Sequence, residues 1–368
     1  MPETVTLLLI VVLGLSVVFD YINGFHDTAN AIATSVSTRA MSPRFAVAMS
    51  AVLNFAGAFI SLKVAATVGS GIVDSGAVTT TVVFAGLVGA IAWNLATWWA
   101  GLPSSSSHAL IGGLIGSAFA ASGPSAIDVD GVVEKVLVPA AVAPLLAFVV
   151  AASTIVVIYW MVGNLRPGPV NRGYRLGQVV SGSMFSLAHG TNDAQKTMGI
   201  ITLALIAHGN LPADSFDVPF WVIVSSATAI ALGTYIGGWR IIRTVGSRII
   251  KMDPAQGFAA QGAGAAVVLT ASHLGFPLST THVISGGVMG AGAAKRLSAV
   301  RWGVAGNIAI AWILTLPAAA IIGAVVYGIS SAFGSGALGP LVVALGLVGL
   351  LIAAFVRRFA QQRLAAAQ

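Results

Sequence analysis

Long apolar segments fill most of the chain, and short polar or charged connections separate them. Because a helix needs about 20 mostly apolar residues to cross a membrane, the pattern predicts eleven candidate spans. Polar residues interrupt the first span at 23–30 and the sixth near Gly190, while the fourth and ninth are short and rich in Ser, Thr and Gly, which favours re-entrant hairpins. The candidate spans are residues 5–38, 44–66, 78–100, 104–122, 136–160, 176–208, 218–240, 255–274, 277–294, 302–330 and 337–356.

The composition supports a membrane location. Of the 368 residues, 57% are hydrophobic and only 8% are charged, whereas soluble domains carry about 25% charged residues. The mean hydropathy is +0.93. We therefore expect an all-α polytopic membrane protein in a lipid bilayer. No secretory leader is expected, since no basic region precedes the first apolar segment. The chain has no cysteine, which excludes disulfides, thiolate metal sites and cysteine nucleophiles.

The basic residues predict an orientation. Fifteen of the 18 Lys and Arg residues lie in clusters that one alternating path places on the same side of the membrane. Because cytoplasmic loops carry an excess of Lys and Arg, we expect the N-terminus outside and the C-terminus in the cytoplasm, in the cell (inner) membrane. The net charge of +7 then records orientation and does not indicate a nucleic-acid partner. The clusters are at residues 39–44, 166–175, 240–251, 295–301 and 357–363.

Two pairs of polar motifs indicate an internal duplication. An offset of 166 aligns "NGFHDTANA" with "HGTNDAQKT", so that Asp27 pairs with Asp193 and Asn30 with Lys196. An offset of 174 aligns "GLPSSSSH", which begins at Gly101, with "GFPLSTTH". Five predicted spans separate the first motif from its copy, so the second repeat is expected to be inverted. Inverted repeats are typical of secondary transporters, with the substrate site where the halves meet. The predicted division is 1–165 for repeat one, 166–332 for repeat two, and 333–368 for an additional C-terminal helix and a basic tail.

Three acids, Asp20, Asp27 and Asp193, lie at membrane depth, where a charge costs about 2.5 kcal/mol or more. They indicate a functional site, the alternative being ion pairs that hold helices together. Carboxylate and amide oxygens suit a proton or Na⁺ and not a transition metal, so Asp27 and Asn30 form a candidate Na⁺ site. Lys196 replaces Asn30 in repeat two and is expected to be a permanent counter-charge for Asp193, or else a phosphate contact.

The Ser and Thr tracts at 104–107 and 279–281 follow a proline and precede glycine-dotted helices. Helix N-termini with free N–H groups bind anions, and two such ends from inverted repeats could surround a tetrahedral oxyanion. Ordinary helix capping is the alternative. Four histidines are candidate proton carriers, because histidine titrates near neutral pH, or else hydrogen-bonded core groups: His26, His108, His189 and His282.

These motifs resemble the inorganic phosphate transporter (PiT) family, and in particular its bacterial low-affinity branch, from about residue 16 to about 330. The resemblance implies symport of phosphate, free or as a neutral metal–phosphate complex, with H⁺ or Na⁺ and with no further cofactor. It implies cation coupling at Asp27, Asn30, Asn192 and Asp193. His26 and Lys196 depart from the asparagines of sodium-coupled animal members, which favours protons. The segment 337–356 is additional to the bacterial pattern and is expected either to pack at a homodimer interface or to cap the scaffold. The implied phosphate contacts are Thr28, Ser104, Ser105, Ser106, Ser107, Ser279, Thr280 and Thr281.

Two alternatives stay open at this point. Another tetrahedral oxyanion, sulfate above all, fits the same scaffold, although a carboxylate that accepts a hydrogen bond from the anion would favour phosphate. An intramembrane hydrolase would use the same Ser, His and Asp residue types, but no G-x-S-x-G nucleophile motif occurs. We therefore expect a transporter and not an enzyme.

Overall fold

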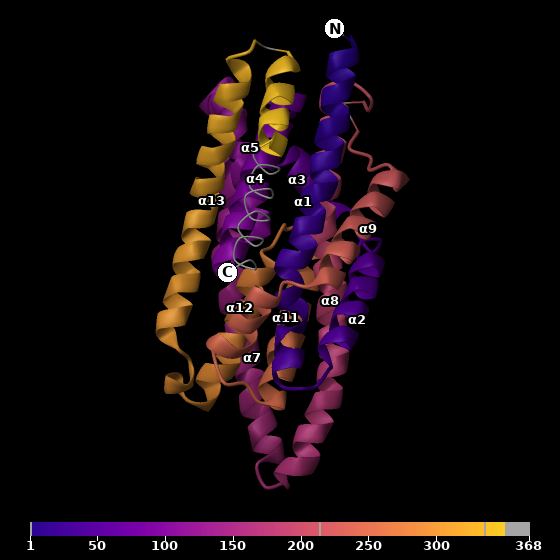
Figure 1. Ribbon diagram of the computed structural model, residues 1–368. Helices are drawn as coiled ribbons and strands as arrows, with labels where there is room; N and C mark the ends of the chain where they lie inside the picture. The colour runs from indigo at the N-terminus through magenta and orange to yellow at the C-terminus, as the bar shows by residue number, and fades with distance from the viewer. Residues whose placement is uncertain (1, 213–214, 335, 350–368) are drawn as a thin grey trace, which may run out of the picture.

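Helices of very different lengths make up the protein (Figure 1). The computed structural model describes residues 2–212, 215–334 and 336–349. Within them, an isolated bridge between Val73 and Ile127 is the one strand-like pairing. The main helices are α1 (Pro2–Ser37), α2 (Pro43–Gly57), α3 (Lys63–Ser70), α4 (Thr80–Ala100), α5 (Ser106–Ser122), α6 (Val129–Val132), the π-helical turn η3 (Val133–Leu137), α7 (Val138–Val162), α8 (Pro167–His208), α9 (Phe220–Ile236), α10 (Trp239–Arg243), η4 (Thr244–Arg248), α11 (Pro254–Leu274), α12 (Thr280–Lys295) and α13 (Trp302–Ser331).

Four of the described helices are long and apolar enough to cross a membrane: α1, α4, the continuous helix Val129–Val162, and α13. A fifth span results if α9 and the helix Trp239–Arg248, bent by 59°, are counted together. Several of the eleven predicted segments are shorter than a full span, because α2 ends at Gly57 and α5 and α12 are brief. α8 is 42 residues long but carries many polar residues. The number of crossings therefore stays a prediction.

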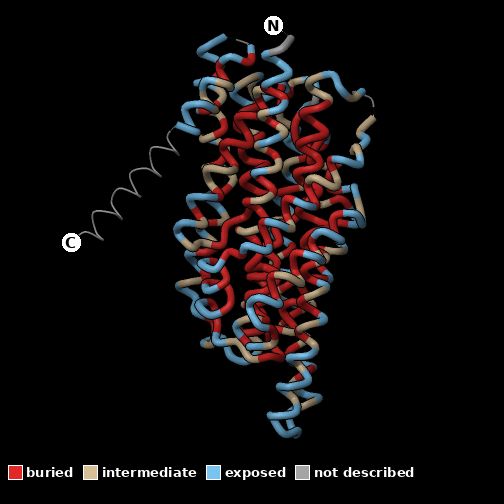
Figure 2. The backbone as a smooth tube through the Cα atoms, turned by 45° about the vertical axis from the view of Figure 1, so that its right-hand side comes forward, coloured by how far each residue is buried: buried red, intermediate tan, exposed pale blue. Residues whose placement is uncertain are grey.

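The burial pattern is that of a membrane protein, with an apolar outside and a polar interior. Buried residues form a central column and exposed residues surround it (Figure 2). Large apolar side chains are exposed on the outer faces of the bundle, including Trp160, Phe220 and Ile313. Aspartates, a lysine, histidines and amides are buried inside. Such a surface is stable in lipid but not in water.

Two helical hairpins enter the bundle from opposite ends. α4 and α5 occupy the upper half in Figure 1, and α11 and α12 the lower half. Each hairpin turns at a glycine with positive φ, Gly101 (+68°) and Gly275 (+87°), a conformation that glycine adopts without strain. The two loops meet inside the protein, since the Ser107 hydroxyl donates to the Leu278 carbonyl at 3.1 Å. The predicted hairpins at 104–122 and 277–294 are therefore the second arms of these two units.

The two hairpins make matching close contacts with α13 and α7. A Cβ on Gly112 of α5 would lie 2.4 Å from the Leu316 carbonyl oxygen of α13. A Cβ on Gly286 of α12 would lie 2.2 Å from the Pro144 carbonyl oxygen of α7. These glycines therefore allow close helix approach, as small residues do in membrane bundles. The reciprocal contacts support the two-repeat interpretation, while the boundaries at 165 and 332 stay predictions.

Two predictions about helix continuity are wrong. α1 runs unbroken through residues 23–30, and α8 runs unbroken past Gly190. Their polar side chains find partners on neighbouring elements, so the backbone keeps its own hydrogen bonds and has no reason to unwind. Of the predicted span 337–356, residues 338–349 are helical. The rest of that span and the basic cluster at 357–363 lie outside the described residues, and the homodimer interface stays a prediction.

Candidate cation and anion site

Polar residues form one buried face along α1. Their spacing of three or four positions brings them to the same side of a helix. α8 has a similar polar face, and the two helices run in opposite directions, α1 descending and α8 rising in Figure 1. The buried residues of these faces are Ser16, Asp20, Asn23, Asp27, Asn30 and Thr34 on α1, and His189, Asp193 and Lys196 on α8.

Asp27 is held by a histidine and by hydroxyls from both hairpins. His26 Nδ1 lies 2.7 Å from Asp27 Oδ1. The Ser106 hydroxyl, at the start of α5, lies 2.7 Å from Asp27 Oδ2. The Thr281 hydroxyl, at the start of α12, lies 3.4 Å from Asp27 Oδ1. The partners of this buried carboxylate are therefore one imidazole and two neutral donors.

Asp193 has a permanent positive partner. The Lys196 ammonium lies 2.5 Å from Asp193 Oδ1, and both side chains are buried. His189 Nε2 lies 3.1 Å from Asp193 Oδ2, and the Thr280 hydroxyl donates to the same oxygen at 3.2 Å. Because the ammonium neutralises the carboxylate at close range, this half of the site carries its own counter-charge.

Lys196 and Asn30 occupy equivalent positions and contact equivalent hairpin residues. The Lys196 ammonium donates to the Ser107 hydroxyl and, at 2.7 Å, to the Leu278 carbonyl. The Asn30 amide nitrogen donates to the Thr281 hydroxyl at 2.9 Å. An offset of 166 relates Asn30 to Lys196, and an offset of 174 relates Ser107 to Thr281. The two halves therefore form one crossed set of contacts.

Three ligand atoms of the types that bind cations converge between α1 and α8. One atom each from Asp27, His189 and Asp193 lies within 4.8 Å of the other two, and all three residues are buried. The amide oxygen of Asn30 is also buried and has no hydrogen-bond partner among the described residues. This arrangement offers carboxylate and amide oxygens to a small cation.

The hairpin ends add anion-binding groups to these cation ligands. α5 and α12 point their N-termini, with Ser106 and Thr280 as first residues, at the same place from opposite halves. Free N–H groups and the helix dipole favour a negative charge there. Hydroxyl donors, the Lys196 ammonium and two carboxylates together can hold an oxyanion beside a cation.

Comparison with known proteins decides the family. The Phosphate transporter family matches residues 23–169 and 164–323, which is most of the chain. The chain belongs to this family. It is thus a transporter and not an enzyme, and it is a multi-pass membrane protein whose substrate is phosphate, taken with a coupling cation. This confirms the family that the four motifs predict.

Individual relatives agree with that assignment. A protein of Mycobacterium tuberculosis (strain CDC 1551 / Oshkosh) named "Probable low-affinity inorganic phosphate transporter" is 52% identical over 88% of this chain and 77% of the relative. A protein of Bacillus subtilis with the same name is 45% identical over 88% of this chain and 98% of the relative. A solved structure titled "The sodium-dependent phosphate transporter" superposes with a TM-score of 0.82 at 25% identity, covering 88% of this chain and 98% of that one.

Several predicted site residues lie near the acids without facing them. The Thr28 hydroxyl donates to the Gly24 carbonyl at 2.6 Å and to the Thr234 carbonyl at 3.2 Å. The Asn192 amide nitrogen donates to the Ser272 hydroxyl at 2.8 Å and to the Phe276 carbonyl, so this residue braces the α11–α12 hairpin. These hydrogen bonds support the scaffold, while the Asn192 amide oxygen is buried without a hydrogen-bond partner among the described residues, so its predicted role in cation coupling stays a prediction.

Two of the predicted phosphate contacts cap helices. The Ser105 hydroxyl accepts from the His108 backbone N–H, and the Ser279 hydroxyl accepts from the His282 backbone N–H. The two histidine rings pack against each other, with centroids 4.8 Å apart. The His282 ring also stacks on Trp312, and no ion pair within the described residues joins His108 or His282 to an aspartate.

Some residues of the site were absent from the predicted set. The Ser106 hydroxyl lies 2.7 Å from Asn23 Oδ1, and Ser104 donates to Thr97, which lies 3.3 Å from His26 Nε2. Asn23 precedes Asp27 by four residues, and this helical spacing is the sequence signal that could have identified it. Thr97 comes from α4 and has no such signal, because its proximity depends on helix packing.

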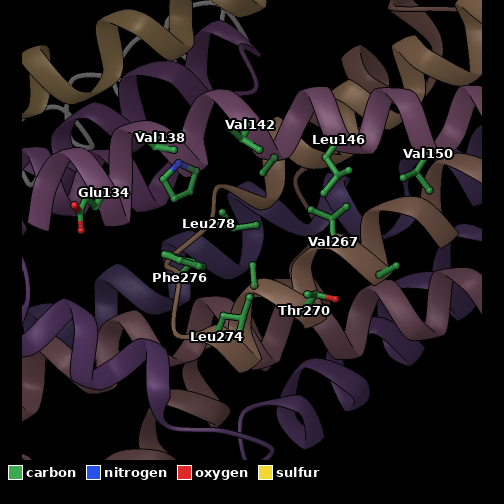
Figure 3. A pocket seen from close by; sticks show the side chains of 14 residues that line it. Glu134, Val138, Val142, Leu146, Val150, Val267, Thr270, Leu274, Phe276 and Leu278 are labelled. Carbon is green, nitrogen blue, oxygen red and sulfur yellow. The ribbon is translucent and has the colours of Figure 1, made fainter.

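An apolar groove lies on the outer side of the lower hairpin loop. Figure 3 shows Phe276 and Leu278 beside it, between the α7 residues Val142 and Leu146 and the end of α11. Its volume is about 460 Å³. The carbonyls of Phe276 and Leu278 bind Asn192 and Lys196, while their side chains face this groove. The loop therefore separates the polar site from an apolar surface that has almost no anion donors.

Proposed function

We propose that this protein imports inorganic phosphate by cation symport and that the preferred coupling cation is a proton. The observation that carries the proposal is the pairing of two buried aspartates, one ammonium and two inward-pointing helix N-termini in a single cluster. The membership of the family supplies phosphate as the substrate. The cluster supplies a reason for coupling, because an anion held beside carboxylates needs a positive charge between them.

In this proposal the ends of α5 and α12 bind the phosphate. Ser106, Ser107, Thr280 and Thr281 offer hydroxyl donors, and they already contact the two aspartates, Lys196 and Asn30. The Lys196 ammonium adds one positive charge for the phosphate oxygens. Ser105 and Ser279 contribute by capping the two helices, while Ser104 supports His26 through Thr97. The preference for phosphate over sulfate follows from Asp27, which can accept a hydrogen bond from a protonated phosphate.

The coupling cation binds on the Asp27 side in this proposal. Asp193 already has an ammonium at 2.5 Å, whereas Asp27 has no Lys or Arg partner among the described ion pairs. The unpaired amide oxygen of Asn30 is available as a further ligand. His26, at 2.7 Å from Asp27, supports a proton as the coupling ion, because an imidazole can share and transfer one. His189 is a further candidate metal ligand of the cluster. If it binds a metal ion, the transported substrate would be a neutral metal–phosphate complex.

Alternating access in this proposal is relative motion of two inverted repeats about the cluster. The crossed contacts of Asn30 with Thr281 and of Lys196 with Ser107 support the symmetry. The proposal also includes the orientation of the chain. The N-terminus lies outside and the C-terminus in the cytoplasm, because the loops rich in Lys and Arg are assigned to the cytoplasmic side.

Phosphate uptake into proteoliposomes tests this function. The purified full chain is reconstituted, and uptake of labelled phosphate is measured with a pH gradient alone and with a Na⁺ gradient alone. Each gradient is then tested again with sulfate as competitor, and again with a metal chelator. We expect uptake under the pH gradient and weak competition by sulfate. Loss of uptake in the chelator would indicate a metal–phosphate substrate, and uptake that requires Na⁺ would contradict proton coupling.

A pair of variants connects the test to the site. Asp27→Asn should reduce gradient-driven uptake about tenfold or more, because the amide cannot exchange a proton. Asp253→Asn is the matched control, since Asp253 pairs with the exposed Lys295 at 3.2 Å outside the cluster. Equal uptake by both variants would show that Asp27 is not the coupling acid.

A further inference from the structure

Asp20 is a buried carboxylate that the contacts of the proposed phosphate and cation sites leave out. It lies on the polar face of α1, seven residues before Asp27, and its exposed fraction is 0%. Seven helical residues span about 10 Å, so Asp20 lies about two helical turns from Asp27, towards the N-terminal side. Thr197 of α8 and Asn23 of α1 lie beside its carboxylate.

Thr197 and Asn23 are near enough to act weakly on the Asp20 carboxylate, but neither reaches it with normal hydrogen-bond geometry. Both of its oxygens are without a hydrogen-bond partner among the residues that the structure describes, and so is the neighbouring Thr197 hydroxyl. No ion pair within those residues includes Asp20. An unpartnered acid and an unpartnered hydroxyl therefore lie together in the interior.

The charged groups that act on Asp20 both come from α8, and neither can serve as its partner. Asp193 has the same charge sign, and Lys196 has the opposite sign. The three N–H groups of the Lys196 ammonium already point to Asp193, to the Ser107 hydroxyl and to the Leu278 carbonyl. No N–H of this ammonium is left for Asp20.

A proton is the ligand that fits this position. An isolated carboxylate in an apolar interior is costly, and protonation removes the charge. A metal cation would need several further oxygens, but the Asn23 amide oxygen is already 2.7 Å from the Ser106 hydroxyl. The neutral carboxylic acid needs only one acceptor for its O–H, and the Thr197 hydroxyl can provide it.

Asp20 is linked to the cation-coupling acid and belongs to one repeat only. Asn23 lies beside Asp20 and contacts Ser106, which in turn contacts Asp27. At the offset of 166 the equivalent of Asp20 is Ser186, whose hydroxyl donates to the Gly182 carbonyl of its own helix. Asp20 therefore has no acidic counterpart on α8. It lies on the same helix as Asp27, which has no lysine partner equivalent to Lys196.

We propose that Asp20 is a second proton-carrying site of the transport cycle. Its carboxylate binds one proton from the side where phosphate enters, remains a neutral acid during the conformational change, and releases the proton to the other side. The proton binds to a carboxylate oxygen and leaves from it, so no other reactant is needed. The inference rests on the proposed proton-coupled import of phosphate.

Two measurements on the full chain in proteoliposomes test this proposal. The first is net uptake of labelled phosphate driven by a pH gradient. The second is exchange of labelled for unlabelled phosphate at equal pH and equal phosphate on both sides, which needs phosphate binding and movement but no net proton transfer. We expect Asp20→Asn to lower net uptake about tenfold or more, because the amide cannot bind and release a proton, and to keep exchange.

Matched variants separate this role from a structural one. Asp20→Glu keeps an acid and should restore gradient-driven uptake. Ser16→Ala, four residues earlier on the same buried face, removes a hydroxyl bonded to the Val12 carbonyl at 2.8 Å and should change neither measurement. Thr197→Val removes the hydroxyl beside Asp20 without touching the acid, and should slow net uptake while exchange continues.

Several outcomes would overturn the inference. If Asp20→Asn keeps full gradient-driven uptake, or if Asp20→Asn and Thr197→Val each reduce exchange and net uptake to the same extent, Asp20 does not carry a coupling proton. If the unaltered chain accumulates phosphate with Na⁺ and ignores the pH gradient, the inference fails while phosphate transport stands. If the unaltered chain exchanges no phosphate at all, the proposed function itself fails.

Discussion

The two motif helices carry an aspartate at matching positions of the aligned motifs, but the partners of the two aspartates differ. On α1, Asp27 is held by His26 and by hydroxyls of the hairpin ends. On α8, Asp193 is held by the Lys196 ammonium at 2.5 Å. Hairpin hydroxyls contact both acids, two at Asp27 and one at Asp193. The histidine partners stand at different positions of the aligned motifs, and the main difference in charge is Lys196 in the place of Asn30.

In the proposed function, this difference leaves the pair of aligned aspartates with one mobile cation, at Asp27, beside the separate proton proposed for Asp20. A buried carboxylate needs a positive charge nearby, and in repeat two the chain itself supplies it. At Asp27, in the proposed function, the coupling cation supplies it. Similar packing with unequal charge therefore fits the proposal that the coupling cation binds at Asp27 and not at Asp193.

The largest expected effect comes from removing the built-in charge. Lys196→Asn makes repeat two resemble repeat one and leaves Asp193 buried without its ammonium. We expect the free energy of unfolding to fall by about 3–5 kcal/mol, measured as thermal unfolding in detergent. Added Na⁺ or lower pH should recover part of the loss, because a bound cation stabilises the folded state.

The exposed Lys295 provides the matched control for that experiment. Lys295→Asn breaks a surface pair with Asp253 at 3.2 Å and should cost at most about 1 kcal/mol. A similar cost for both lysine variants would show that Lys196 does not neutralise Asp193 in the folded protein.

The reverse substitution should abolish coupling in repeat one. Asn30→Lys places an ammonium beside Asp27, and a fixed charge then competes with the mobile cation. We expect gradient-driven phosphate uptake to fall about tenfold or more, measured in proteoliposomes. Asn30→Gln keeps the amide and serves as the control; uptake by Asn30→Lys at the level of this control would contradict the proposed location of the cation.

The hairpin contacts should respond alike in the two halves. Gly112→Ala brings a methyl group to 2.4 Å from the Leu316 carbonyl oxygen of α13, and Gly286→Ala brings one to 2.2 Å from the Pro144 carbonyl oxygen of α7. We expect each to lower stability by about 1–3 kcal/mol, measured by thermal unfolding. Gly306→Ala, which meets nothing within 4 Å, is the control, and a clear inequality between the two hairpin variants would weaken the reciprocal packing.

The smallest expected effects come from the two helix caps. Ser105→Ala and Ser279→Ala each remove a side-chain acceptor for a backbone N–H. Each loss should cost about 1 kcal/mol of stability, with similar values in the two hairpins. Unfolding measurements on both variants check this, and a much larger loss in one of them would indicate that its hydroxyl has a further structural role.

Much of the site could be predicted from local sequence, and the exceptions share one cause. The duplicated motifs identified Asp27, Asp193 and Lys196, which the structure brings into one cluster. Thr28 belongs to the same motif, yet its hydroxyl is bound by backbone carbonyls. Which side of a continuous helix faces its partner depends on packing, and a motif that spans more than one helical turn contains residues on several sides.

The predicted breaks in α1 and α8 illustrate the same limit. Polar residues in an apolar segment can be satisfied either by unwinding the helix or by partners on other elements. Asp27 finds its hydroxyl partners in Ser106 and Thr281, which lie far away in the sequence. Nothing local to residues 23–30 could distinguish the two solutions.

The sequence by itself determined the membrane class, the helical character, the two pairs of repeated motifs and the family, because composition, spacing and motif identity are local properties of the chain. Only the tertiary structure decided that both motif helices stay continuous, that Ser106 and Thr280 contact the acids while Ser105 and Ser279 cap helices, and that Asp20 has no ion-pair partner among the described residues. Those outcomes depend on how helices from different parts of the chain are rotated and packed against one another, and that relation is not contained in any single segment.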